Sequence, residues 1–198
     1  MTDVTIDAAD IVTVNAEDYI NGLTIDSGDE TTVTSNSSIV NSNIWGSDVK
    51  VITEEGDITG LSIISDTDAT ITAKIGSIID SGVNADGSIV AEAADISGLT
   101  ATATEDISIT AENDIVNTNA EGENVTFEAK KGSIINSGVY ADVAALLMAD
   151  DEIDGTAVTA KGTDLPEGVE AIIATANYIG ASSFTPSRPR KKPSFPGR

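Results

Sequence analysis

The stretch 76-GSIIDSGV-83 returns almost unchanged as 132-GSIINSGV-139. Its first isoleucine belongs to a series in which neighbours are 18 to 20 residues apart. The series is Ile20, Ile39, Ile58, Ile78, Ile96, Ile115, Ile134, Ile153 and Ile172. A period of this length is typical of solenoids, in which each repeat buries its apolar side only by stacking on its neighbours.

The positions after the first eight anchor isoleucines, Ile20 to Ile153, share simple properties. The residue two positions on is always Gly, Asn or Asp, which tolerate positive φ, so we expect a left-handed bend in every coil. These corner residues are Gly22, Asn41, Gly60, Asp80, Gly98, Asn117, Asn136 and Gly155. The residue five positions on is always apolar and is expected to point inward. Three positions on, leucines alternate with Ser or Thr as far as Thr118, which gives a double period.

Segments of alternating polarity, such as Ile107-Ser108-Ile109, precede the anchors and predict further strands. Polar turns such as Glu54-Glu55-Gly56-Asp57 separate them. We therefore predict an all-β fold, a parallel β-helix (β-solenoid) of eight to nine coils with a repeat of about 19 residues. It is expected to occupy residues 1–180, followed by a basic, Pro-rich, disordered tail at 181–198.

Composition excludes several classes of function. The net charge is −23, so the body should repel nucleic acid and anionic membranes. The absence of Cys and His excludes disulfides, thiolate sites, Ser-His-Asp triads and histidine-bound zinc. The longest apolar run, Val143–Met148, is too short to span a bilayer. No signal peptide follows Met1, which indicates either an intracellular protein or a piece of a longer secreted chain.

The repeat length and the Gly/Asn-marked corners resemble those of filamentous haemagglutinin-type exoproteins, the large adhesins exported by two-partner secretion. The resemblance covers roughly residues 12–178 and implies a right-handed parallel β-helix displayed outside the cell as a stalk or adhesin. The secretion domain of that family is not recognisable in this sequence. A second resemblance is to bactofilin-type cytoskeletal β-helices, which carry proline-rich or basic tails.

Acidic residues recur in two turns of the repeat. The first set follows the anchors by eight or nine residues: Asp29, Asp48, Asp66, Asp86, Glu105, Glu123 and Asp142. A stacked column of carboxylates could bind Ca²⁺, for which Asp29, Asp48, Asp66 and Asp86 are the candidates. The alternative, which we favour, is solvated turn residues and no cofactor.

The second acidic set precedes the anchors: Asp57, Asp95, Asp114 and Glu152. Two carboxylates one coil apart, such as Asp95 and Asp114, could suit a retaining glycosidase. However, a sugar cleft requires aromatic platforms, and we expect Trp45, Tyr19, Tyr140 and Tyr178 to fall in three or more different coil positions. We therefore predict turn residues and no enzyme.

Other polar residues have simpler interpretations. Asn41, Asn117 and Asn136 are expected to stack as an amide ladder, and Lys130 with Lys131 to neutralise nearby acids. The tail residues Arg188, Arg190, Lys191 and Lys192 indicate either a linker or docking on an acidic neighbour, an anionic lipid or a cell-wall polymer.

The sequence thus predicts a non-catalytic, adhesive stalk of a bacterial surface or secreted exoprotein, located outside the cell. Its expected partners are neighbouring coils of the same or identical chains and a cell-surface or glycan receptor, with no nucleic acid and no membrane span. The first alternative is a self-assembling filament subunit, cytoplasmic if cytoskeletal, and the second is a carbohydrate-active β-helix enzyme.

Overall fold

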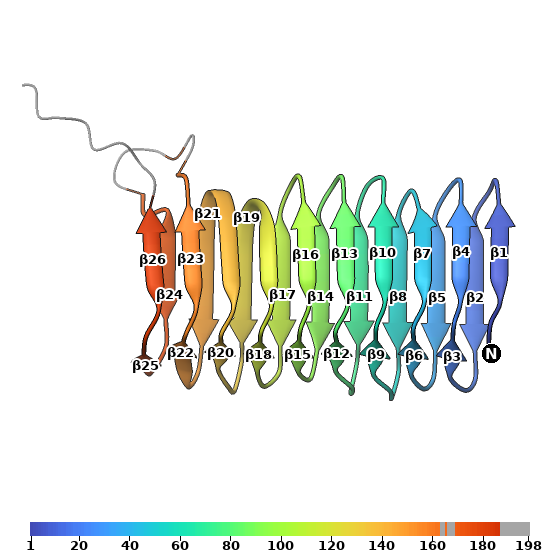
Figure 1. Cartoon of the computed structure of the whole chain (residues 1–198), viewed down its shortest axis with the longest axis horizontal. Coiled ribbons are helices and arrows are strands. Elements are labelled where there is room, and N and C mark those ends of the chain that lie inside the picture. The colour runs from blue at the N-terminus through green and yellow to red at the C-terminus, as the bar shows by residue number, and fades with distance from the viewer. Residues whose placement is uncertain (163–164, 166–168, 187–198) are drawn as a thin grey trace, which may run out of the picture.

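The computed structural model describes residues 1–162, 165 and 169–186. Every regular element in these residues is a β-strand, and the strands stack in parallel along one axis (Figure 1). Each coil contributes one strand to a front face, one to a back face and one short strand to the lower edge. In Figure 1 the chain rises along the front face, descends along the back face and advances from right to left. The chain is therefore a right-handed β-solenoid, as predicted.

The strands fall into three stacked sets. The front face contains β1 (Thr5–Ala8), β4 (Thr24–Ser27), β7 (Asn43–Gly46), β10 (Ser62–Ser65), β13 (Gly82–Ala85), β16 (Thr100–Ala103), β23 (Ala157–Ala160) and β26 (Ser183–Pro186). The back face contains β2 (Val12–Ala16), β5 (Thr31–Ser35), β8 (Val49–Thr53), β11 (Ala69–Ala73), β14 (Ile89–Ala93), β17 (Ile107–Ala111) and β24 (Ile172–Thr175). Two longer strands, β19 (Asn119–Ala129) and β21 (Gly138–Ala149), run through both faces. The lower edge contains β3 (Ile20–Asn21), β6 (Ile39–Val40), β9 (Ile58–Thr59), β12 (Ile78–Ile79), β15 (Ile96–Ser97), β18 (Ile115–Val116), β20 (Ile134–Ile135), β22 (Glu152–Asp154) and β25 (Tyr178–Ile179).

The anchor isoleucines hold the coils in register along the lower edge. From Ile20 to Ile153 each anchor is the parallel partner of the next. All eight are buried without measurable exposure. Backbone hydrogen bonds continue this alignment, as where Ile20 N–H donates to the Ser38 carbonyl at 2.9 Å. The predicted repeat is confirmed over these coils.

The bend after each short strand has the predicted backbone geometry. All eight corner residues have positive φ, between 46° at Asp80 and 68° at Gly22 and Gly98. Asp3, which is not one of the predicted corner residues, also has positive φ, 50°, and lies against Gly22. Asn and Asp tolerate this conformation because their short polar side chains bond locally, whereas Gly has no Cβ to clash.

The alternation of Leu with Ser or Thr after the corner combines packing and hydrogen bonding. Leu23 and Ser42 occupy the same position in successive coils, and both are fully buried. The Ser42 hydroxyl accepts a hydrogen bond from the Leu23 N–H at 3.3 Å and donates to the Val40 carbonyl at 3.0 Å. The buried hydroxyl is therefore satisfied, and a bulky side chain alternates with a small one along the axis.

The apolar core lies between the front and back faces. The position five residues after each anchor, from Ile25 to Val158, is buried as predicted. Facing it are back-face residues such as Ile71 and Ile109, also fully buried. Phe127 is the largest side chain in its back-face row, and it follows Thr118, the last residue of the leucine alternation, in the same coil.

The ninth anchor differs from the prediction. Ile172 belongs to β24, where it pairs with Ala145 in the back face. The residue stacked on Ile153 is Ile179, 26 residues further along. The segment between β23 and β24 is longer than the corresponding corner of the other coils, and Ile172-Ile173 imitates the anchor pair Ile134-Ile135.

The predicted end of the solenoid at residue 180 is also wrong. Strand β26 (Ser183–Pro186) pairs with β23 and completes the last coil. The extra residues of the long corner displace this strand beyond the predicted boundary. The remainder of the predicted tail lies outside the described residues.

Candidate functional site

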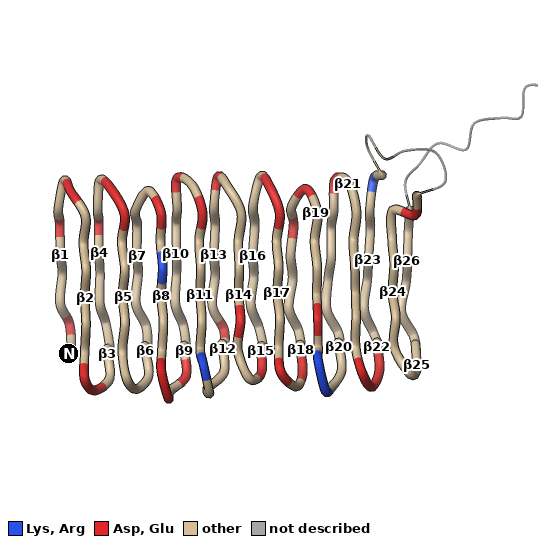
Figure 2. The backbone as a smooth tube through the Cα atoms, turned by 180° about the vertical axis from the view of Figure 1, so that it is seen from behind, with Lys and Arg blue, Asp and Glu red and all other residues tan. Residues whose placement is uncertain are grey.

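Carboxylates crowd the upper edge of the solenoid, where front-face strands lead into back-face strands, and some of them have local partners. Figure 2 shows acidic residues along both long edges of the solenoid. Asp29 Oδ1 accepts the Glu30 N–H at 2.9 Å, and Asp142 pairs with Lys161 at 2.6 Å. In the described part of the chain, no group of three or more acidic side chains is placed to hold a metal ion. The calcium candidates Asp29, Asp48, Asp66 and Asp86 therefore do not gather into a site.

Asp48 shows the electrostatic strain of this edge. Partial burial raises its pKa above the ordinary value, the charges of Asp68 and Glu30 raise it further, and Lys50 opposes the shift. A carboxylate whose pKa is raised in the folded state favours folding when protonated. The edge is thus stabilised by screening or neutralisation of charge, which cations in general can provide.

At the lower edge, three members of the second acidic set, Asp57, Asp95 and Asp114, accept backbone hydrogen bonds from the following coil. Asp57 Oδ1 accepts the Ser77 N–H at 2.8 Å, and Asp114 Oδ1 accepts the Ser133 N–H at 2.8 Å. Asp95 Oδ1 accepts the Asp114 N–H at 3.2 Å. These carboxylates therefore satisfy N–H groups in turns that the strand ladder does not reach. Their contacts match turn residues rather than a catalytic pair.

This role explains a Gly-Ser pair that the sequence repeats. Gly132 precedes Ser133 and lies directly against the Asp114 carboxylate, so that a Cβ at this position would overlap Oδ1. Gly76 stands in the same relation to Asp57. The glycine leaves room for the carboxylate to reach the N–H of the serine that follows. In both cases the sequence marks this contact by an Asp about 19 residues before the Gly-Ser pair.

The predicted neutralising lysines pair with one acidic residue. Lys131 Nζ lies 2.6 Å from Glu112, and Lys130 Nζ lies 4.0 Å from the same carboxylate. The hydrogen bond from Lys131, followed by its charge, lowers the pKa of Glu112. These side chains are exposed, so the pairs add little to stability.

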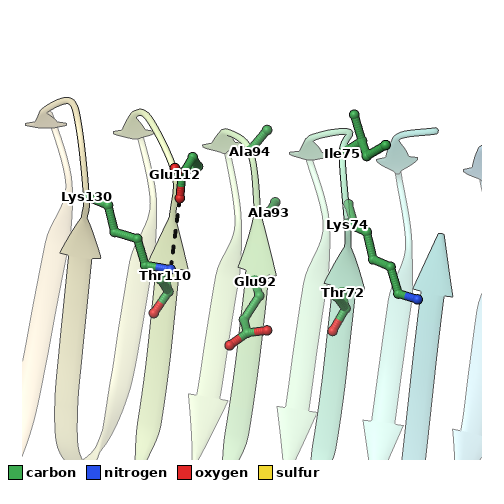
Figure 3. A pocket seen from close by; sticks show the side chains of 10 residues that line it. Thr72, Lys74, Ile75, Glu92, Ala93, Ala94, Thr110, Glu112 and Lys130 are labelled. Atoms are coloured by element: carbon green, nitrogen blue, oxygen red, sulfur yellow. Dashed lines mark ion pairs between the residues drawn. The ribbon is translucent and has the colours of Figure 1, made fainter. Parts of the chain in front are cut away.

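A depression with a volume of about 470 Å³ lies beside Lys130. Figure 3 shows Lys74, Glu92 and Lys130 around it, with Ile75 projecting at the rim. It arises because β14 and β15 are joined by two residues, Ala94 and Asp95, whereas the preceding coil uses four. Lys74 is paired with Glu54 at 2.7 Å. The depression follows from unequal turn lengths, and Lys130 at its wall pairs with Glu112.

The aromatic residues are arranged more regularly than predicted. Trp45 and Tyr140 both lie six residues after their anchors and belong to the same outward-facing row of the front face. Tyr19 and Tyr178 both immediately precede an anchor position. The four aromatic residues therefore occupy two coil positions. Their distances along the sequence from the anchor isoleucines would have predicted this arrangement.

The predicted asparagine ladder is not continuous. Asn117 and Asn136 occupy successive coils, but Asn41 is followed by Gly60 at the next corner. The Asn41 side-chain oxygen lies against Gly60, in the space that a Cβ would need. The four tail residues Arg188, Arg190, Lys191 and Lys192 lie outside the described residues.

Comparisons with protein families, with curated proteins and with solved structures give no match to this chain. The described residues contain no helix of the length and apolarity needed to cross a bilayer. The β-solenoid and the contacts of its edges are accordingly the observations on which a functional proposal rests.

Proposed function

We propose that this chain is a non-catalytic structural and adhesive segment, a β-helical stalk of a large bacterial surface or secreted exoprotein. The single observation that carries the proposal is the use of the lower-edge carboxylates Asp57, Asp95 and Asp114 to accept backbone N–H groups of the following coils. The acidic residues best placed for chemistry thus maintain the stack. A rod of this kind holds the segments joined to its two ends apart, and it presents long rows of side chains on its faces.

The charge of the body supports a role in an aqueous, crowded setting. Acidic residues line both long edges, and the net charge of −23 opposes lateral aggregation of exposed strands. The resemblance of the repeat to filamentous haemagglutinin-type exoproteins supports the same proposal.

Surface labelling tests this function directly. Antibody raised against the purified chain should label intact cells of the source organism without permeabilisation, and purified chain should bind to a surface those cells colonise. Labelling that requires permeabilisation would refute the proposal and favour an intracellular role.

A second candidate, a self-assembling filament subunit, is favoured by one observation. In the last described coil, Ile179 is 42% exposed although the equivalent Ile153 is buried. Ile172, Ala174 and Phe184 line a depression of about 310 Å³ beside it. Another coil stacked there would cover these apolar groups, and a second copy could provide it.

A further inference from the structure

The front face carries two parallel rows of outward side chains that differ from the acidic edges. Between β7 and β21 one row contains Trp45, Ile64, Asn84, Thr102, Glu121 and Tyr140. The other contains Asn43, Ser62, Gly82, Thr100, Asn119 and Gly138. Between β7 and β21, Glu121 is the one charged residue in the two rows, although the chain as a whole carries −23. Beyond Trp45 the first row continues to Asp26 of β4.

Three depressions follow one another along these rows, and together we call them the groove. The first, of about 330 Å³, is lined by Trp45 with Asp26 and Asp66, and it shares Ile64 with the second, of about 250 Å³. The second meets a third, of about 340 Å³, at Thr100 and Thr102, and this third depression extends past Tyr140. The groove thus crosses the front-face strands of successive coils from β7 to β21.

Gly82 deepens this groove. Gly82 and Gly138 both occupy outward positions where other coils carry a side chain, but the Asn119 side chain fills the space beside Gly138. A Cβ added at Gly82 would meet no atom within 4 Å, so the space above it is open. Gly82 also lacks the positive φ of the corner glycines, so the backbone there accepts other residues.

Aromatic rings lie at both ends of the groove. Trp45 and Tyr140 are each 37% exposed, and five coil steps of about 4.8 Å place them about 24 Å apart. The Lys161 ammonium lies 5.0 Å from the centre of the Tyr140 ring and is paired with Asp142. The tyrosine is therefore held in place by a cation on one side.

We propose that this groove binds a neutral, extended polysaccharide that lies along the solenoid axis. Hydroxyl and amide side chains donate and accept hydrogen bonds with sugar hydroxyls, and aromatic rings stack on the apolar faces of sugar rings. The coil spacing is close to the length of one hexose unit, so a regular polymer meets one pair of outward positions at every step. The acidic edges repel polyanions, which excludes uronate and sulfated chains.

The proposal rests on the adhesive function proposed above and specifies its partner. A second copy of the chain is a less suitable occupant, because this face has hydroxyl and amide side chains where a stable protein interface would bury an apolar centre.

Calorimetric titration of the full chain with defined oligosaccharides tests the inference. The probes are cellohexaose, maltohexaose, xylohexaose and mannohexaose, with hexagalacturonate as the anionic comparison. At least one neutral hexasaccharide should bind, more tightly than its trisaccharide, because only the longer probe reaches both Trp45 and Tyr140. Hexagalacturonate should not bind. Failure of all four neutral probes, or tighter binding of hexagalacturonate, overturns the inference.

Three variants localise the binding. Trp45→Ala should weaken it at least tenfold, and Gly82→Val should abolish it by filling the groove while leaving the urea midpoint unchanged. Tyr19→Ala removes an aromatic side chain that is 50% exposed outside the groove, and should leave affinity unchanged. Equal affinity in all three variants overturns the groove assignment. So does sedimentation as a dimer that either groove variant dissociates, because the face would then be a self-interface. Labelled intact cells without glycan binding would refute this inference alone, whereas unlabelled intact cells would refute the stalk.

Discussion

Replacing Gly98 by valine should unfold the solenoid at lower urea concentration, because the corner requires a left-handed backbone. Gly98 has φ of 68°, a conformation in which a β-branched residue is strained by about 1–3 kcal/mol. The added Cβ would also overlap Asp80 Oδ1 of the preceding coil, while the Asp80 Cα lies 3.4 Å away. The carboxylate can turn aside but the backbone cannot, so we expect backbone strain to dominate and the total loss to be about 1–3 kcal/mol.

Urea unfolding followed by circular dichroism measures this loss, provided that the slope with denaturant is unchanged. Gly82→Val is the matched control, because its site is open and lacks positive φ, and it should stay within about 0.5 kcal/mol of the parent. Adding Asp80→Ala to Gly98→Val separates crowding from strain, since only crowding is relieved. Equal stability of Gly98→Val and Gly82→Val would refute the account of the corners.

Three further predictions concern the lower edge, the core and the upper edge. Asp114→Ala should cost about 1–3 kcal/mol in urea unfolding because the Ser133 N–H loses its acceptor, and Asp114→Asn should cost less; equal losses would contradict the hydrogen bond. Ile96→Ala should cost about 2–5 kcal/mol, whereas Ile75→Ala, at a position 67% exposed, should be nearly neutral; a neutral Ile96→Ala would exclude the stacked core. Asp48 has a raised pKa in the folded state, so its contribution to stability is greatest at low pH and is lost as pH rises through that pKa. Asp48→Asn should therefore raise the urea midpoint at neutral pH but not at about pH 3; no change at neutral pH would contradict the electrostatic strain.

The repeat could be predicted because every coil uses the same residue types at the same buried and bent positions. The anchor isoleucines and the Gly, Asn or Asp two residues later are constrained at the same point of every coil, so the period and the bends were readable. The last coil could not be predicted in this way, because Ile172-Ile173 also satisfies the local pattern. Only the pairing between coils shows that Ile179, and not Ile172, stacks on Ile153.

The surface was harder to predict than the core, for physical reasons. The hydrogen bond from Ser133 to Asp114 joins residues 19 apart, and its local signal is a Gly-Ser that looks like an ordinary turn. The groove depends on the absence of a side chain at Gly82 and on the alignment of Trp45 with Tyr140 across five coil steps. Such features arise from stacking order, which a single repeat does not contain.

Sedimentation velocity of the full chain, repeated across salt and calcium concentrations and combined with negative-stain imaging, tests the central claim that the chain is a stalk segment. We expect a short, monomeric rod whose sedimentation does not change with calcium. Salt should stabilise its acidic edges only by screening their charges. Filaments that lengthen end to end with protein concentration would contradict it and would assign the exposed apolar groups of the last coil to subunit assembly.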